Sequence, residues 1–380
     1  MNDTPASEPA AIADSAPPDD ERFMALALAL GRRSLGIAWP NPAVGAVIVK
    51  DGIIVGRGWT QAGGRPHAET QALKRAGKAA EGATMYVTLE PCSHQGKSPP
   101  CADAIIRARL ARVVSSLEDP NPEVAGEGHR KLTERKIAVE IGLGAEQARR
   151  DHAGHLRRIG EGRPHVLLKL ALSADGKVAA AGRKPISITG DAARYRVYQM
   201  RGRYDAILVG IGTVLADNPA LTCRLPGMHE RSPVRVVLDS QLRAPLASHV
   251  IATVSETPTW VFASGTASAM AEQVLIERGA RVFRVPTKAG RLDLGEVLKV
   301  LGNEGITRLM VEGGPTVATS FVEANLIDEV ALFHSDKTIG DDGIEALEGL
   351  PLTALTEGGR LKKVTEETIG GDRLESYERA

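Results

Sequence analysis

The sequence predicts an α/β protein of two domains, and three observations support this fold class. The chain has 380 residues, which is long for one domain, and 43% of them are hydrophobic, enough to fill sizeable cores. β-Rich segments alternate with amphipathic helical segments along most of the chain. In the second half the strand segments are runs of Val, Leu and Ile, which is typical of a mainly parallel, doubly wound sheet.

The first half predicts a helix and a hairpin, followed by alternating helices and strands. A helix is expected over residues 19–34, where an acidic first turn precedes apolar residues at helical spacing. Asp51-Gly52 separates two β-rich runs within residues 43–59, the pattern of a hairpin with a two-residue turn. The later elements are a helix over 67–77 that ends at Gly77, a strand over 83–91, a helix over 101–110, a strand over 111–119 and a helix–strand unit over 128–142.

The second half repeats the alternation after a charged helix around residues 149–158 and a linker at 160–164. Strands are expected over 165–172, 205–212, 234–240, 259–264, 280–286, 308–314 and 328–335. Helices are expected over 190–204, 268–279, 293–305 and 316–326. The predicted organisation is therefore a tail over 1–19, a first domain over 20–160 and a second domain over 161–380.

The charge balance excludes a general attraction to polyanions. Lys plus Arg equals Asp plus Glu, with 47 residues in each class. The most basic stretch, residues 148–158, has no aromatic residue to stack on bases, so we interpret it as a solvated helix face or linker. We expect no nucleic-acid partner.

The N-terminal segment and the cysteine count indicate a cytoplasmic protein. Residues 1–20 are rich in Pro, Ala, Ser and Asp and lack the features of a signal peptide, so we expect a disordered tail. No apolar run is long enough to span a membrane, and we expect no membrane partner. Three cysteines in a chain of this length do not form a disulfide scaffold.

Cys92 and Cys101 raise the first question of function, because eight residues separate them. That spacing is too wide for a C-x-x-C metal motif, so the pair is a stretched metal site, a disulfide or two unrelated residues. His67 and Glu69 lie near the start of a predicted helix. Two thiolates and one imidazole suit Zn²⁺ with an open position for water, and a nearby carboxylate can transfer the proton of that water.

This combination matches part of the H-x-E…P-C-x-x-C signature of zinc-dependent nucleobase deaminases. His67, Glu69 and Cys92 fit the signature, whereas the second cysteine comes later than it requires. We favour metal-dependent deamination over purely structural cysteines, with His67, Cys92 and Cys101 as metal ligands and Glu69 as the catalytic proton carrier. His94 is interpreted as a loop residue, because three ligands are already present.

Longer motifs around these residues identify a family. They are "PNPAVGAVIV" at residues 40–49, "VTLEPCSH" at 87–94, "PCSHQGKSPPC" at 91–101 and "DPNPEVAGEG" at 119–128. The chain resembles the bifunctional deaminase/reductase of riboflavin biosynthesis from about residue 20 onward. In that family the wide cysteine spacing is the norm, which makes this resemblance more specific than the bare deaminase signature.

The resemblance implies two domains and two reactions. The first domain would resemble cytidine deaminase, bind one Zn²⁺ and hydrolyse the 2-amino group of a diaminopyrimidinone that carries a phosphoribosylamino side chain. The second would resemble dihydrofolate reductase and use NADPH to reduce the ribosyl group to ribityl. The expected partners are these small pyrimidine substrates and further copies of the chain. Asn41 would line the base pocket, although a turn before a strand explains "PNP" equally well.

Two glycine-rich turns stand out in the second half, within residues 209–224 and 311–321. Each follows a strand and offers backbone N–H groups to a phosphate, although a tight structural turn is an equal alternative. Leu215 stands where a Rossmann fingerprint has its third glycine, so spacing alone does not predict a nicotinamide cofactor.

The resemblance extends to "LKLALSADGKVA" at residues 168–179, "ITG" at 188–190 and "VLDS" at 237–240. By position, the cofactor contacts of the family fall on Ala171, Thr213, Asp217, Ser240, Gly314, Pro315 and Thr316. Its substrate contacts fall on Arg201, Leu221, Arg224 and Glu312. The two arginines suit a ribose phosphate, although each alone would be interpreted as a surface ion pair. Lys169 in a buried strand is a further substrate-binding candidate, unless its ammonium reaches water at a strand edge.

The chain also departs from the family pattern. Pro185 and Ser187 replace a polar residue and a tryptophan, and residues 334–343 lack the usual start of that segment. We expect these changes to loosen contacts around the cofactor or the sugar. Two alternatives remain: a deaminase of another substrate with an appended domain, and a zinc-stabilised protein that binds phosphorylated pterin- or flavin-like ligands. The intact Glu69 disfavours the binding protein.

Overall fold

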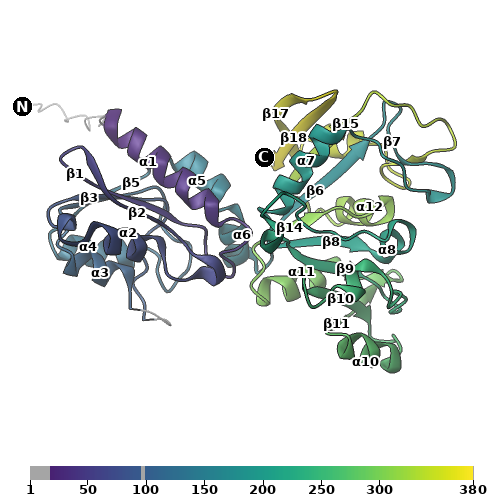
Figure 1. Ribbon diagram of the computed structural model, residues 1–380, viewed down its shortest axis with the longest axis horizontal. Coiled ribbons are helices and arrows are strands. Elements are labelled where there is room, and N and C mark those ends of the chain that lie inside the picture. The colour runs from purple at the N-terminus through teal and green to yellow at the C-terminus, as the bar shows by residue number, and fades with distance from the viewer. Residues whose placement is uncertain (1–17, 96–98, 380) are drawn as a thin grey trace, which may run out of the picture. The chain divides into compact units, whose positions relative to one another are not determined.

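The chain forms two compact α/β units in a computed structural model that describes residues 18–95 and 99–379 (Figure 1). The first unit contains residues 44–58 and 68–148 together with α1 (Pro18–Gly31), and the second is built mainly from residues after 148. Of the predicted tail, residues 1–17 lie outside the described part of the chain. No helix among the described residues is long and apolar enough to cross a membrane.

The first unit is a five-stranded sheet with α1 on one face and α2, α3 and α4 on the other (Figure 1). The strand order is β2-β1-β3-β4-β5, in which β1 and β3 are antiparallel and β3, β4 and β5 are parallel. The strands are β1 (Gly45–Lys50), β2 (Ile53–Trp59), β3 (Thr84–Val87), β4 (Arg112–Ser115) and β5 (Ala138–Ile141). The helices after α1 are α2 (Ala68–Ala76), α3 (Cys101–Arg107), α4 (Glu127–Glu134) and α5 (Ala145–Asp151).

The predicted hairpin is present, and its turn explains the choice of residues. Asp51 and Gly52 have φ angles of 51° and 74°, so both central turn residues are left-handed. A two-residue turn of that kind matches the twist of the strands it joins, and Asp-Gly tolerates it well. Gly77, expected to end α2, also has a positive φ of 53°.

The second unit is a nine-stranded sheet in the order β11-β10-β9-β8-β14-β6-β15-β18-β17. All pairs from β11 to β15 are parallel, as the apolar strands predicted. These strands are β6 (His165–Leu172), β8 (Ala206–Gly210), β9 (Val234–Leu238), β10 (Thr259–Ser264), β11 (Arg281–Val285), β14 (Arg308–Val311) and β15 (Glu329–His334). Two-stranded pairs are formed by β7 (Lys177–Ala179) with β16 (Ile344–Glu345), and by β12 (Thr287–Lys288) with β13 (Arg291–Leu292).

The helices of the second unit connect these strands and cover the sheet. They are α6 (Ala153–Glu161), α7 (Asp191–Arg201), α8 (Ile211–Asp217), α9 (His249–Ala252), α10 (Ala269–Glu277), α11 (Leu294–Asn303), α12 (Pro315–Glu323) and α13 (Thr353–Thr356). The main core lies between sheet and helices and includes the fully buried Leu168, Leu208 and Phe321. Burial of such side chains stabilises a fold by about 1.5–3 kcal/mol each.

The sheet ends in an antiparallel hairpin that the sequence analysis did not include. It consists of β17 (Leu361–Ile369) and β18 (Asp372–Arg379), and β18 pairs with β15. Most of β17 is exposed, because it is an edge strand rich in Lys, Glu and Thr residues. The Gly370-Gly371 turn between the strands is the signal that predicts such a hairpin.

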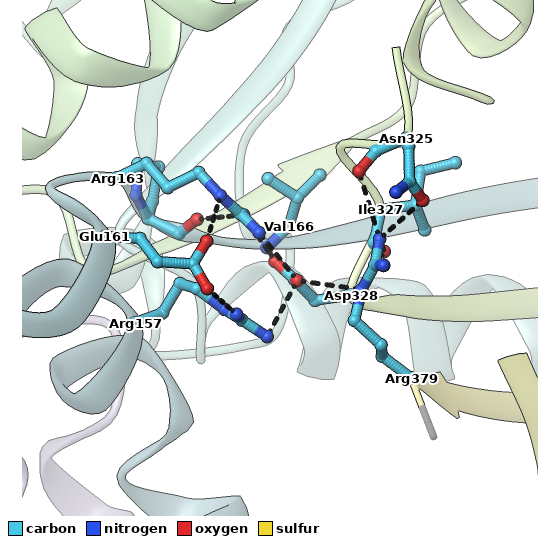
Figure 2. A network of polar contacts seen from close by, with 9 residues as sticks. Arg157, Glu161, Arg163, Val166, Asn325, Ile327, Asp328 and Arg379 are labelled. Carbon is cyan, nitrogen blue, oxygen red and sulfur yellow. Dashed lines mark hydrogen bonds and ion pairs between the residues drawn. The ribbon is translucent and has the colours of Figure 1, made fainter. Parts of the chain in front are cut away.

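A buried carboxylate, Asp328, joins α6, β6, β18 and the loop before β6 (Figure 2). Its side chain is only 1% exposed and lies 3.0 Å from Arg157, 2.7 Å from Arg163 and 3.5 Å from Arg379. The backbone N–H of Val166 in β6 also donates to it at 2.9 Å. Arg157 belongs to the basic stretch 148–158, which was interpreted as a solvated helix face or linker. Arg149 and Arg150 are exposed as expected, whereas Arg157 pairs with the buried Asp328.

We expect Asp328→Asn to destabilise the second unit by about 3 kcal/mol, because it removes the buried anion that three partly buried arginines share. Burial raises the pKa of Asp328, but the surrounding arginines outweigh burial and lower it overall. The carboxylate therefore contributes stability above its unfolded pKa, and this contribution is lost as the pH falls through the lower folded pKa. Urea unfolding of the variant and of the exposed control Asp336→Asn measures the effect, and equal midpoints would contradict it.

Candidate active sites

Three potential metal ligands converge beside α2 and α3. The ligand atoms of His67, Cys92 and Cys101 lie within 4.8 Å of one another. His67 immediately precedes α2, and Cys101 is the first residue of α3. The backbone N–H of Cys101 donates to Sγ of Cys92 at 3.3 Å, so the chain between the cysteines closes into a loop. Residues 96–98 of this loop lie outside the described part of the chain.

The electrostatics around the cysteines favour a bound cation. No disulfide joins Cys92 and Cys101. A hydrogen bond with Cys92, burial and the charge of Glu69 all raise the pKa of the Cys101 thiol. Two thiolates beside a carboxylate repel one another unless a cation neutralises them. The donor set of two sulfurs and one imidazole nitrogen suits Zn²⁺, so these residues fit a zinc ion with one open position.

Glu69 and Asn41 both lie beside this cluster. Glu69 is in the first turn of α2 and only 3% exposed, close enough to Cys101 to influence its thiol. Nδ2 of Asn41 donates to the carbonyl of Gly64 at 2.9 Å and lies 3.3 Å from Nε2 of His67. His94 is exposed and does not belong to the three-ligand group, as interpreted from the sequence.

The second unit contains a cavity of about 1300 Å³ at the carboxyl ends of its parallel strands. The cavity lies where the strand order of the sheet reverses. On one side of β8 lies β9, the next strand along the chain, and on the other side lies the much later strand β14. Ligands of open α/β sheets bind at such switch points. The volume exceeds the 300–1,000 Å³ that is usual for one small ligand, so there is room for a cofactor and a substrate together.

All seven predicted cofactor contacts line this cavity: Ala171, Thr213, Asp217, Ser240, Gly314, Pro315 and Thr316. Gly314 is the N-cap of α12, whose first N–H groups are available to a phosphate. The glycine turns also have a packing role. A Cβ on Gly313 would lie 2.7 Å from Val317, and one on Gly210 would lie 2.8 Å from the same residue. The two interpretations of the glycine-rich turns, a tight structural turn and a ligand contact, are therefore compatible.

Lys169, Glu312 and Arg201 form a buried charged group in the cavity wall. Arg201 donates to both oxygens of Glu312, at 2.8 and 3.0 Å, and Nζ of Lys169 lies 3.8 Å from Oε2. Burial lowers the pKa of Lys169, although Glu312 opposes that shift. Burial raises the pKa of Glu312, but both cations outweigh it, so Glu312 stays ionised. Of the two alternatives for Lys169, the structure therefore favours a buried and paired ammonium over one that reaches water at a strand edge.

Leu221 and Arg224 lie outside the cavity lining. The side chain of Leu221 is 2% exposed and belongs to an apolar core cluster. Arg224 is exposed, and its guanidinium lies 5.9 Å from the centre of the Tyr198 ring. Arg201 approaches the same ring at 5.7 Å, so Tyr198 connects the two arginines. Sequence reasoning did not single out Tyr198, since one aromatic residue in a helix carries no functional signal.

The segments that depart from the family pattern are held by polar contacts. Pro185 and Ser187 line the cavity. The hydroxyl of Ser187 accepts a hydrogen bond from Arg194 at 2.8 Å, and its carbonyl accepts one from Lys337 at 2.9 Å. Within residues 334–343, the backbone N–H groups of 339 and 340 donate to Asp175 at 3.1 and 2.7 Å. These contacts hold both segments in place, and the first of them lines the cavity.

Comparisons with known proteins divide the chain in the same way. Residues 17–117 match the cytidine and deoxycytidylate deaminase zinc-binding region, and residues 164–373 match the RibD C-terminal domain. Riboflavin biosynthesis protein RibD of Escherichia coli K12 is 41% identical over 358 residues, which are 91% of this chain and 96% of the relative. RibD of Aquifex aeolicus is 39% identical over 360 residues, 95% of this chain and 98% of the relative.

Solved structures agree with these sequence matches. RibD of Acinetobacter baumannii superposes with a TM-score of 0.85 at 34% identity, covering 95% of this chain and 99% of that one. A diaminohydroxyphosphoribosylaminopyrimidine deaminase/5-amino-6-(5-phosphoribosylamino)uracil reductase of Thermotoga maritima gives 0.83 at 35% identity, with the same coverage.

A zinc-type deaminase domain followed by a reductase domain defines a bifunctional enzyme, a deaminase and reductase in one chain. The resemblance found in the sequence motifs is confirmed over nearly the full length. The chain belongs to the RibD family of riboflavin-biosynthesis proteins.

Proposed function

We propose that the enzyme catalyses two consecutive steps. The first is hydrolytic deamination of 2,5-diamino-6-(5-phosphoribosylamino)pyrimidin-4(3H)-one. The second is NADPH-dependent reduction of the ribosyl side chain of 5-amino-6-(5-phosphoribosylamino)uracil to ribityl. The observation that carries this proposal is the presence of two separate sets of polar residues, the zinc-type cluster with Glu69 and the buried group around Lys169. The name of the Thermotoga maritima relative supports the choice of substrates.

In the deaminase domain, His67, Cys92 and Cys101 would hold one Zn²⁺, which supplies an activated water when bound. Glu69 takes a proton and delivers it to the leaving amino group, because its carboxylate is buried beside the ligands. Asn41, beside His67, would orient the pyrimidine.

In the reductase domain, the cofactor supplies a hydride, whereas the chain positions the cofactor and the sugar and supplies a proton. Lys169 holds a proton next to the place where the sugar ring opens, and Glu312 keeps that ammonium oriented. Arg201 would bind the ribose phosphate with its remaining donors, and the exposed Arg224 would reach the same group across Tyr198. Leu221 would contribute through the backbone of its loop, since its side chain is buried.

The choice of NADPH over NADH rests on cations at the cavity edge. Arg243, Lys288 and Arg291 line the same cavity as Ser240. Lys288 and Arg291 face each other across the β12–β13 pair. A 2′-phosphate on the adenosine ribose distinguishes NADPH, and arginine commonly accommodates it. The sequence analysis missed these three residues, because they lie in short loops and a small hairpin without a motif.

We expect Arg243→Ala to raise the KM for NADPH about tenfold, the effect of losing one charge-assisted hydrogen bond. The KM for NADH should not change, because NADH lacks the 2′-phosphate. Steady-state kinetics with both cofactors measure the difference. Parallel increases for NADPH and NADH would show that Arg243 does not contact the 2′-phosphate.

We further propose that the deaminase domain ends near residue 160, that the reductase domain covers the rest, and that the enzyme is cytoplasmic. Helix α6 ends at Glu161, and Gly162 follows with a φ of 69°, which supports a break in the chain before β6. The compact units divide earlier, after Ala148, so α6 packs with the second unit. Thiol ligands such as Cys92 remain reduced in that compartment.

The diaminopyrimidinone phosphate supplied with NADPH tests the whole proposal. We expect ammonia release followed by stoichiometric NADPH oxidation. A wild-type enzyme that releases ammonia but shows no substrate-dependent NADPH oxidation would contradict the reductase assignment. NADPH oxidation without ammonia release would contradict the deaminase assignment.

A further inference from the structure

Glu90 is a buried carboxylate two residues before the metal ligand Cys92. Its side chain has no exposed surface. Oε2 accepts hydrogen bonds from the backbone N–H groups of Asp119 at 3.1 Å and Gly126 at 3.0 Å. Oε1 accepts them from Gly128 at 2.8 Å and His129 at 3.2 Å. One side chain thus holds both the loop 119–126 and the first turn of α4.

These four donors also decide against a second metal site. The ligand atoms of Glu90, Glu118 and His129 lie within 4.8 Å of one another, which is close enough to hold an ion. A carboxylate has about four lone-pair sites, and the backbone donors of Glu90 occupy that number. We therefore interpret Glu90 as a brace for the backbone.

Helix α4, which Glu90 holds at its start, contacts the chain on both sides of Cys92. A Cβ on Gly128 would lie 2.0 Å from the carbonyl oxygen of Pro91, so the helix packs against the residue before the ligand. Nζ of Lys131 donates to the carbonyl of Ser93, the residue after the ligand, at 3.0 Å. Helix α4 therefore fixes the residues on both sides of Cys92, Pro91 and Ser93.

Cys92 in turn is linked to the other cysteine. Its carbonyl accepts a hydrogen bond from Ala102 at 3.1 Å, and its Sγ accepts one from Cys101 at 3.3 Å. A zinc–sulfur bond has a narrow length range near 2.3 Å, so a displacement of Cys92 by a few tenths of an ångström weakens metal binding. The path from Glu90 to the metal ligands runs through backbone contacts, helix α4 and the side chain of Lys131.

We propose that Glu90 is a positioning residue of the zinc site, which fixes Cys92 by holding the loop 119–126 and the start of α4. This inference rests on the proposed zinc-dependent function. It assigns a role to the "DPNPEVAGEG" motif, whose Asp119, Gly126 and Gly128 provide three of the four N–H donors.

The test is the zinc affinity of Glu90→Gln in the full chain, measured by competition with a chromophoric chelator. Glutamine keeps the shape of the side chain but turns an amide N–H₂ group toward backbone N–H donors, which leaves buried donors unpaired. We expect zinc binding to weaken about 10- to 100-fold, as for other residues that orient metal ligands. The control Glu127→Gln changes the exposed neighbouring carboxylate on α4 and should bind zinc like the wild type.

Rescue by zinc separates positioning from a merely structural role. With zinc in excess, Glu90→Gln should recover deaminase activity, because Glu90 is enclosed by backbone and does not face the substrate. A merely structural role would lower the melting temperature equally with and without zinc and leave zinc affinity unchanged. That result, or a failure of excess zinc to restore activity, would overturn the proposal.

Lys131→Met provides a second variant in case Glu90→Gln does not fold. It removes the hydrogen bond to Ser93 and the longer contact of 3.5 Å with Asp103 on α3, and we expect a loss of zinc affinity of about tenfold at most. Wild-type affinity in Lys131→Met, together with an unfolded Glu90→Gln, would refute the positioning role. If the wild-type chain itself binds no zinc, the proposed zinc function fails instead, so the two failures are distinguishable.

Discussion

Replacing Glu69 by Gln is expected to reduce the rate of ammonia release by about 10²- to 10⁴-fold, the usual contribution of a positioned acid–base group. Glutamine has the same shape, so the buried position in α2 should tolerate it, but it cannot take up and deliver a proton. NADPH oxidation with the deaminated intermediate should continue at the wild-type rate. An ammonia assay and an absorbance assay for NADPH measure the two activities separately.

Three controls make this result specific. The variant Glu81→Gln changes an exposed carboxylate of the same domain and should affect neither activity. The zinc content of Glu69→Gln should equal that of the wild type, because Glu69 is not one of the three ligands. A strong chelator should stop ammonia release in the wild type, whereas a reductant should not. Ammonia release by Glu69→Gln at a near wild-type rate would rule out the assigned role.

The sequence was sufficient to predict most of the fold, because the elements carry local signals. Asp51-Gly52 predicts its hairpin, since both residues tolerate the positive φ angles of a two-residue turn whose twist matches the strands. The apolar runs at residues 165–172 and 308–311 predict buried parallel strands, and they became the neighbours β6 and β14. The hairpin of β17 and β18 was missed because its polar edge strand lacks an apolar period, and only Gly370-Gly371 indicated it.

The two sites differ in how far sequence reasoning reached them. The proposed metal ligands are recognisable because soft donors are rare in the chain and their chemistry points to zinc. The group of Lys169, Arg201 and Glu312 depends on the placement of β6 and β14 side by side and on α7 packing near them, which no spacing reveals. The family resemblance supplied these residues, and the structure gave them contacts. The hydrogen bonds of Glu90 likewise follow from tertiary packing, since a Glu before Pro-Cys has no recognisable role in isolation.

Replacing Lys169 by Met is expected to lower reductase activity by about 10²- to 10⁴-fold while ammonia release stays at the wild-type rate. Methionine keeps a long apolar side chain in the buried strand, and Glu312 retains its two hydrogen bonds from Arg201. The loss is therefore expected from the missing proton donor and not from an unpaired carboxylate. The exposed Lys184→Met serves as the control and should retain both activities.

The pH dependence gives this prediction a second measurement. Burial lowers the pKa of Lys169 below its usual value of 10.5, although Glu312 opposes the shift. If the ammonium form is required, kcat/KM of the reductase decreases as the pH rises through that lowered pKa. This basic limb of the pH profile disappears in the residual activity of Lys169→Met.

The same lowered pKa has the opposite effect on stability. A lysine whose pKa is lower in the folded state than in the unfolded state destabilises the fold at neutral pH, where it is protonated. Lys169→Met should therefore unfold at the same denaturant concentration as the wild type or a higher one. A variant that loses both stability and activity would indicate a structural role for Lys169, whereas lost activity with retained stability indicates a role in the reaction.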